Sequence, residues 1–184
     1  MIHKSSRIGE RVFIGSGVII DKNVMIGNDV FIGHNVVLRD DVTLGRGVVI
    51  GHNAVIEYGT SIERKTVIQT LCYIAAKTFI GSYVFMAPCV TCTNEWHISK
   101  WRNNIMKQIL KGPTIGDGCR IGAKALIMPG VNIGENAVIG AGSIITKNIR
   151  ARQVWHGETE AKYYRNVPDN QLIITDKEVE GCLS

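Results

Sequence analysis

Aromatic residues are sparse in this sequence, at 7% of 184 residues, while hydrophobic residues make up 45% and charged residues 20%, as in an ordinary soluble protein. No apolar run approaches the ~18 residues that a membrane span needs, and the opening MIHKSSRIGE lacks the apolar core of a signal peptide. No polybasic arm suggests nucleic-acid binding. The 5 cysteines, an odd number without a secreted spacing pattern, favour a reducing compartment. We expect a cytoplasmic protein with neither a membrane nor a nucleic-acid partner.

Glycine is abundant, with 20 residues, and the net charge of +5 is unevenly distributed. Between Glu95 and Gly112, Lys100, Arg102, Lys107 and Lys111 stand against one acidic residue. The segment 147–165 is also basic, with five basic and two acidic residues. Such patches favour an anionic ligand such as a phosphate or a nucleotide, although solvated surface charge would explain them equally well.

A period of six residues runs through most of the chain. Large aliphatic residues recur at Ile8, Ile14, Ile20, Ile26, Ile32, Leu38, Leu44, Ile50, Ile56, Ile62, Ile68, Ile74, Ile80 and Met86, and again at Ile115, Ile121, Ile127, Ile133, Ile139 and Ile145. A small or β-branched residue follows most of them four positions later, and glycine often comes directly after the aliphatic residue.

The period predicts a short strand, a turn and another short strand, with one aliphatic side chain pointing inward from each side. Three such units close a triangular coil of about 18 residues, and coils stack at the usual strand spacing of ~4.8 Å. We expect glycine to ease the corners because it tolerates positive φ. An antiparallel sandwich would show alternation of two, which this sequence does not.

This pattern resembles the hexapeptide-repeat family of left-handed β-helices over residues 8–150, and the left-handed winding is taken from that family. We expect an all-β fold, a left-handed parallel β-helix of about seven triangular coils in residues 1–150. The repeat breaks at about 92–114, which predicts a protruding loop. Residues 151–184 are expected to form a short appendage, with helix near 161–164 and 170–180.

Two patterns suggest metal binding but have simpler explanations. His34 and His52 fall one above the other in "IGHN" corners, where turn geometry alone accounts for them. Cys89 and Cys92 form a CxxC, but Cys92 occupies an inward slot and no second pair has zinc spacing. We expect no metal site.

The run GPTIG…IGA…PGVNIG…VIGAGSIITK resembles the segment that hexapeptide acyltransferases use to hold acetyl-CoA in a groove between adjacent prisms. The resemblance implies close approach of the backbone to the pantetheine arm at small residues, and phosphate contacts near the nucleotide end. The implied residues are Ala123, Ala141, Gly142, Thr146, Lys147 and Lys162. The last of these stands in GETEAK, which is one residue longer than the family's GxPAK element and lacks its proline.

The acceptor side centres on Asn94 and His97, because sugar O-acetyltransferases of this superfamily place a catalytic histidine close to where Asn94 stands. A hydroxyl must lose its proton during attack, whereas a neutral amine needs only to be oriented. Asn94 therefore favours an amine acceptor, and His97 remains a candidate base or a loop histidine packed between Trp96 and Trp101. Trp96 and Tyr58 are candidate acceptor-binding residues.

The leading hypothesis is a homotrimeric enzyme that transfers an acetyl group from acetyl-CoA to the amine of a sugar, with the closest resemblance to the nucleotide-amino-sugar N-acetyltransferases. Sugar O-acetylation with His97 as base is the nearest alternative. A metal hydratase resembling γ-type carbonic anhydrases and a non-catalytic trimeric scaffold are two further alternatives.

Overall fold

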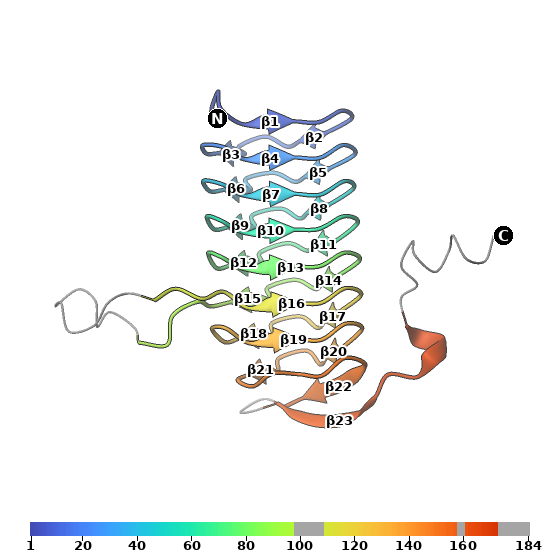
Figure 1. Ribbon diagram of the computed structural model, residues 1–184. Helices are drawn as coiled ribbons and strands as arrows, with labels where there is room; N and C mark the ends of the chain where they lie inside the picture. The colour runs from blue at the N-terminus through green and yellow to red at the C-terminus, as the bar shows by residue number, and fades with distance from the viewer. Residues whose placement is uncertain (98–108, 158–160, 173–184) are drawn as a thin grey trace.

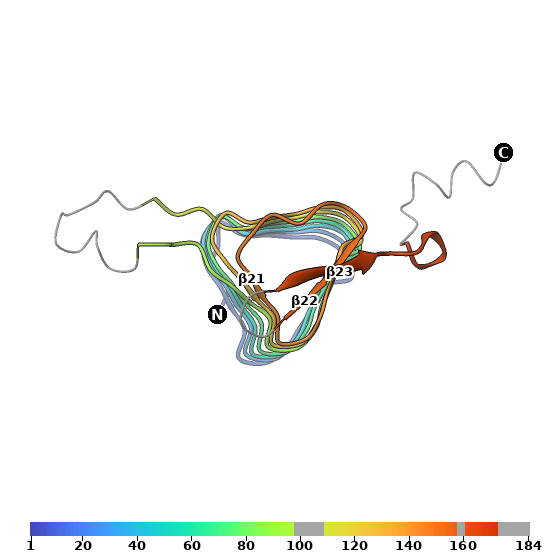
Figure 2. The same ribbon diagram turned by 90° about the horizontal axis from the view of Figure 1, so that it is seen from below.

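The computed structural model is a three-sided parallel β-helix, described over residues 1–97, 109–157 and 161–172 (Figure 1). Each two-residue strand inside a sheet pairs in parallel with the strands one coil before and one coil after it, and the strands at the ends of the sheets pair on one side. The view along the axis shows the triangular outline (Figure 2). In Figure 1 the front strands run from left to right as the chain descends, so the winding is left-handed, as the resemblance implied.

The three sides are three sheets. The first sheet contains β1 (Arg7–Ile8), β4 (Met25–Ile26), β7 (Thr43–Leu44), β10 (Ser61–Ile62), β13 (Phe79–Ile80), β16 (Thr114–Ile115) and β19 (Asn132–Ile133). The second contains β2 (Phe13–Ile14), β5 (Phe31–Ile32), β8 (Val49–Ile50), β11 (Val67–Ile68), β14 (Phe85–Met86), β17 (Arg120–Ile121), β20 (Val138–Ile139), β22 (Gln153–His156) and β23 (Lys162–Asn166). The third contains β3 (Ile19–Ile20), β6 (Val37–Leu38), β9 (Val55–Ile56), β12 (Tyr73–Ile74), β15 (Thr91–Cys92), β18 (Leu126–Ile127) and β21 (Ile144–Ile145).

Strand geometry explains the core, because successive side chains of a strand point to opposite faces. In every two-residue strand after β1 the second side chain is the more buried one, so the predicted aliphatic residues fill the prism. Ile32, Ile50 and Ile68 have no exposed surface. Truncating such a residue to alanine costs about 2–5 kcal/mol.

The corners correct the expected role of glycine. The glycines that directly follow the aliphatic residues have no positive φ; that conformation falls two residues later, at Gly17, Asn35 and Asn53. The first glycine of each corner is needed because coils approach closely there. A Cβ on Gly15 would lie 2.7 Å from the carbonyl carbon of Gly33, one coil on.

Each edge of the prism is named here by the corner that forms it. In the second coil the first corner is 27–30, the second corner is 33–36 and the third corner is 39–42. The predicted insertion leaves the prism at the third corner, after β15, and returns before β16 (Figures 1 and 2). Ile80 then pairs with Ile115, so stacking continues across the insertion.

The end of the described chain corrects another expectation. The helix expected near 161–164 is wrong: Lys162–Asn166 forms β23, which pairs antiparallel with β22. Since β22 extends the second sheet beyond β20, its outer edge would be unpaired without β23. Of the second expected helix, only a 3₁₀ turn at Asp169–Gln171 is seen, and residues 173–184 lie outside the described part. The domain division at residue 150 stays a prediction.

Candidate active site

A hollow of ≈ 380 Å³ lies at the third corner, where the insertion leaves the prism. It is lined by Asn94, Trp96, His97, Ile109, Lys111, Pro129 and Gly130. These residues come from the outgoing arm of the insertion, from its returning arm and from the next coil. The hollow therefore exists only because the prism is interrupted at this corner.

Main-chain hydrogen bonds fix the two arms to each other and to the prism. The amide N–H of Lys111 donates to the carbonyl oxygen of Asn94 at 2.9 Å, and the N–H of Gly130 donates to that of Lys111 at 2.8 Å. The indole N–H of Trp96 donates to the carbonyl oxygen of Pro129 at 3.0 Å. The walls of the hollow are thus held at defined positions.

The side chain of Asn94 has a defined orientation. Its Nδ2 donates to the carbonyl oxygen of Ala76 at 3.3 Å, and Ala76 lies one coil earlier at the same corner. A carbonyl oxygen only accepts, so the amide nitrogen must face Ala76 and Oδ1 is left for another donor. Asn94 can therefore orient an N–H group, but it cannot remove a proton.

The other predicted acceptor residues differ in position. His97 lines the hollow and is exposed. Trp96 lines it too, with 54% of its surface exposed. Tyr58 lies at the same corner two coils before Asn94, but it does not line the hollow. Trp101, expected to pack against His97, lies outside the described residues.

Sequence reasoning missed Ile109, Lys111, Pro129 and Gly130 as lining residues. Pro129 could have been predicted, because the register places it at the position equivalent to Asn94 one coil later (Leu126 pairs with Thr91). Ile109 and Lys111 lie on the returning arm, and no periodicity places that arm relative to Asn94.

Three of the predicted donor residues lie together at the second corner. Ala123 and Ala141 occupy equivalent positions in successive coils, and the N–H of Gly142 donates to the carbonyl oxygen of Ala123 at 2.8 Å. Gly142 has a φ of +69°, and a Cβ built on it would meet nothing within 4 Å. The backbone at this corner is therefore open to close approach by a ligand such as an extended pantetheine arm.

The remaining donor residues lie elsewhere. Thr146 and Lys147 are at the third corner, after β21. Lys162 is exposed on β23, at the end of the stack. Within one chain the third sheet separates Ala123, Ala141 and Gly142 at the second corner from Asn94 at the third, whereas Thr146 and Lys147 share the third corner with Asn94.

The stacked histidines have a structural explanation. Their rings lie 5.1 Å apart and nearly parallel. Nδ1 of His34 accepts from the backbone N–H of Ser16 at 2.8 Å, and Nδ1 of His52 accepts from the N–H of His34 at 2.8 Å. Asp40 makes the same kind of contact to the N–H of Lys22 at another corner. The described residues contain no cluster of three or more His, Cys, Asp or Glu side chains with metal-binding geometry.

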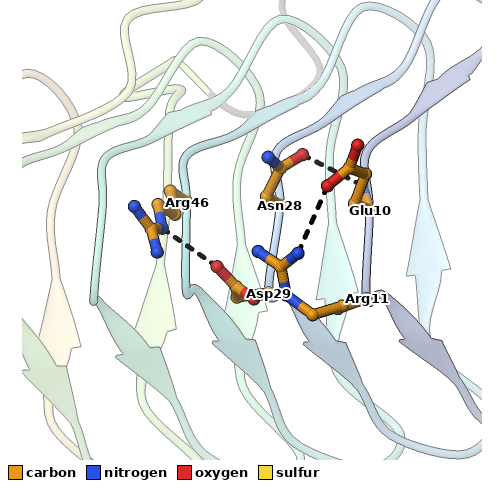
Figure 3. Close-up of polar contacts among 5 residues, drawn as sticks. All are labelled: Glu10, Arg11, Asn28, Asp29 and Arg46. Carbon is orange, nitrogen blue, oxygen red and sulfur yellow. Dashed lines mark hydrogen bonds and ion pairs between the residues drawn. The ribbon is translucent and has the colours of Figure 1, made fainter.

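A second hollow of ≈ 330 Å³ lies at the first corner, lined by Asp29, Arg46, Gly47, Arg64 and Lys65. Its acidic residue is already paired: Asp29 contacts both Arg11 and Arg46 (Figure 3). The hydrogen bond from Arg11 lowers the pKa of the Asp29 carboxyl. Glu10 adds a further ion pair to Arg11. None of the predicted site residues lies here, and we interpret this corner as a surface charge ladder.

Across the described residues there is no helix with the length and apolar character needed to cross a membrane.

The family model described as "Hexapeptide repeat of succinyl-transferase" matches residues 6–39, 41–76 and 114–147, and "Bacterial transferase hexapeptide (six repeats)" matches residues 23–57.

Similar proteins include sugar acetyltransferases. The galactoside O-acetyltransferase of Lactococcus lactis subsp. lactis (strain IL1403) is 31% identical over 99 residues, which are 53% of this chain and 47% of that protein. The chain thus spans about half the length of this curated relative. The crystal structure of a maltose O-acetyltransferase from Clostridium difficile 630 matches with a TM-score of 0.62 and 28% identity, over 68% of this chain and 70% of that one.

A mutant of AntD, an N-acyltransferase from Bacillus cereus in complex with dTDP and coenzyme A, matches with a TM-score of 0.58 over 97% of this chain and 89% of that one. At 19% identity this likeness shows a shared fold alone.

Proposed function

Because this chain belongs to the hexapeptide-repeat transferase family, we propose that it transfers an acetyl group from acetyl-CoA to the amino group of a sugar, in a site between two copies of the chain. The observation that carries the proposal is the amide of Asn94, held by Ala76 at the edge of the hollow. The nucleotide-linked form of such a sugar is the preferred acceptor.

The acceptor is oriented by the hollow rather than activated by a strong base. Oδ1 of Asn94 accepts an N–H of the sugar amine and thereby directs the nitrogen lone pair toward the thioester. The exposed ring of Trp96 offers an apolar surface for the sugar. This arrangement suits an amine, which is nucleophilic once neutral.

The amine nitrogen attacks the thioester carbonyl, a C–N bond forms, and the tetrahedral intermediate expels the thiolate as the C–S bond breaks. The nitrogen loses a proton and the thiolate gains one. Main-chain N–H groups near Gly142 are candidate donors to the developing oxyanion.

A second copy of the chain completes the site. Ala123, Ala141 and Gly142 hold the donor at one corner, while Asn94 belongs to another, so two copies side by side can contribute one corner each. The outward strand residues support such packing, because Phe13, Phe31 and Phe85 on the second sheet and Ile19 and Tyr73 on the third are exposed apolar side chains. Exposed apolar surface of this extent is typical of an interface. We propose a homotrimer.

O-acetylation is the second candidate function, favoured by one observation in the hollow. His97 lines it beside Asn94 and can act as the base that a hydroxyl acceptor requires. The named activities of the galactoside and maltose O-acetyltransferases support the same reading.

The test is a thiol-release assay with acetyl-CoA against nucleotide-linked 3- and 4-amino sugars and against hydroxyl sugars. Turnover with an amine, with the product confirmed as an amide by mass spectrometry, is the expected result. Turnover with hydroxyl acceptors alone would assign O-acetylation instead. Failure to bind acetyl-CoA in calorimetry would reject both in favour of a non-catalytic scaffold.

A further inference from the structure

We propose that Lys111 determines specificity by selecting an acceptor that carries negative charge, such as the diphosphate of a nucleotide-linked sugar. The inference rests on the proposed function in one respect: it takes the hollow at the third corner to be the acceptor site. Neither the family's donor motif nor the Asn94 argument assigns any role to Lys111.

The position of Lys111 is set by its backbone and by the residue beside it. Its N–H and its carbonyl oxygen bond to Asn94 and to Gly130, respectively. The aliphatic stem packs over Gly130, where a Cβ would lie 3.0 Å from Cδ of the lysine. Because residue 130 is glycine, the stem can lie against the backbone and the side chain forms part of the wall of the hollow.

The charge of Lys111 has no acidic counterpart among the described residues that line the hollow. No carboxylate lines the hollow among the described residues, and within the described ranges the Lys111 ammonium makes no hydrogen bond or ion pair. A cation at the rim of a hollow without an anionic neighbour favours an anionic ligand.

Trp96 adds a second element of recognition. Its indole N–H is fixed on Pro129, while the ring remains 54% exposed and lines the same hollow. A fixed aromatic face next to a cation suits a ligand with a sugar or base to stack and a phosphate to pair. A galactoside or maltose carries no charge for Lys111 to bind, so this wall separates the two classes of acceptor.

The experiment compares each acceptor with its uncharged counterpart, namely a nucleotide-linked amino sugar with the same amino sugar free. The enzymes are wild type, Lys111→Met, Lys111→Arg and the control Lys22→Met. Lys22 is an exposed lysine at the same corner, several coils from the hollow. We expect Lys111→Met to raise KM for the nucleotide-linked acceptor about tenfold, with little change in kcat or in KM for the free sugar. Lys111→Arg should restore most of the loss, and Lys22→Met should resemble wild type.

Equal effects of Lys111→Met on charged and uncharged acceptors would overturn the proposal, as would no effect on either. If only hydroxyl acceptors turn over, the assignment of an amine acceptor is wrong but the role of Lys111 is still testable. The KM values are then compared for a sugar phosphate and for the same sugar without phosphate. Binding of UDP, measured by calorimetry at low and high salt, gives a readout independent of turnover. Affinity that is unchanged by Lys111→Met would again reject the role of Lys111, whereas salt-sensitive affinity reduced about tenfold by this substitution would support it.

Discussion

The side-chain amide of Asn94 donates a hydrogen bond of 3.3 Å to the carbonyl oxygen of Ala76, the residue at the equivalent position one coil earlier. This contact fixes which end of the amide faces the hollow. Oδ1 of Asn94 faces the hollow at the place where a hydroxyl acceptor would need an imidazole to take its proton. The loss of activity on substitution of Asn94, compared with that on substitution of His97, therefore distinguishes an amine acceptor from a hydroxyl acceptor.

We expect Asn94→Ala to lower kcat/KM for an amino-sugar acceptor about 10- to 100-fold, because one orienting hydrogen bond is lost. His97→Ala should cost less than tenfold with the same acceptor. Steady-state kinetics with both variants, alongside circular dichroism to verify folding, checks this prediction. Near-complete loss in His97→Ala with a mild effect of Asn94→Ala would instead favour hydroxyl chemistry.

The second corner offers a test of donor binding that leaves the hollow untouched. Ala141 is exposed, so a leucine there should be tolerated by the fold while it occupies space needed by the pantetheine arm. We expect Ala141→Leu to weaken acetyl-CoA binding at least about tenfold in calorimetry. Ala151→Leu is the matched control, because Ala151 is also an exposed corner alanine but belongs to the first corner. Equal weakening by both variants would count against a donor site at Ala141.

The repeat predicted most of the fold because each six-residue unit needs one inward aliphatic side chain. Residues such as Ile32 and Ile121 that fill this position are recognisable from the sequence alone. The role of the corner glycines was misjudged because a contact such as Gly15 against Gly33 exists only between coils. β23 was missed for a related reason: the edge that it pairs with, β22, appears only after the stack is built.

The candidate site was only partly accessible to sequence reasoning. Asn94 and His97 were found because their motif is contiguous with the repeat. Lys111 was not, since it reaches the hollow on the returning arm of an insertion whose path no periodicity defines.

The cysteine thiols differ in accessibility, and this difference gives a way to detect donor binding at the second corner. Burial raises the pKa of the Cys72 thiol to about 11 and that of Cys119 to about 12, and it raises the pKa of Cys92 as well. These thiols stay protonated and shielded at pH 8. Cys89 is only half-buried and lies at the second corner, one coil before Ala123.

We therefore expect iodoacetamide to modify Cys89 faster than Cys72, Cys92 or Cys119 at pH 8, and acetyl-CoA, whose sulfur is blocked as a thioester, to slow the modification of Cys89 several-fold. Peptide mass spectrometry resolves each cysteine separately, Cys182 included. The Ala141→Leu variant should lose the protection but keep the reactivity. Protection that persists in this variant would place the donor away from the second corner.

The stacked histidines yield a prediction about stability rather than chemistry. Nδ1 of His52 accepts the backbone N–H of His34, the contact that an Asx side chain makes at other corners, as Asn28 does with the N–H of Glu10. His52→Asn should therefore preserve the free energy of unfolding within about 0.5 kcal/mol. His52→Leu removes the acceptor and should lower it by about 1 kcal/mol.

Urea unfolding of the two variants separates this structural role from metal binding. Because the N–H of His34 is the group left unpaired, the cost of His52→Leu should be the same with and without a chelator. A loss of stability on chelation of the wild-type protein, absent in His52→Asn, would show instead that the two imidazoles hold a metal.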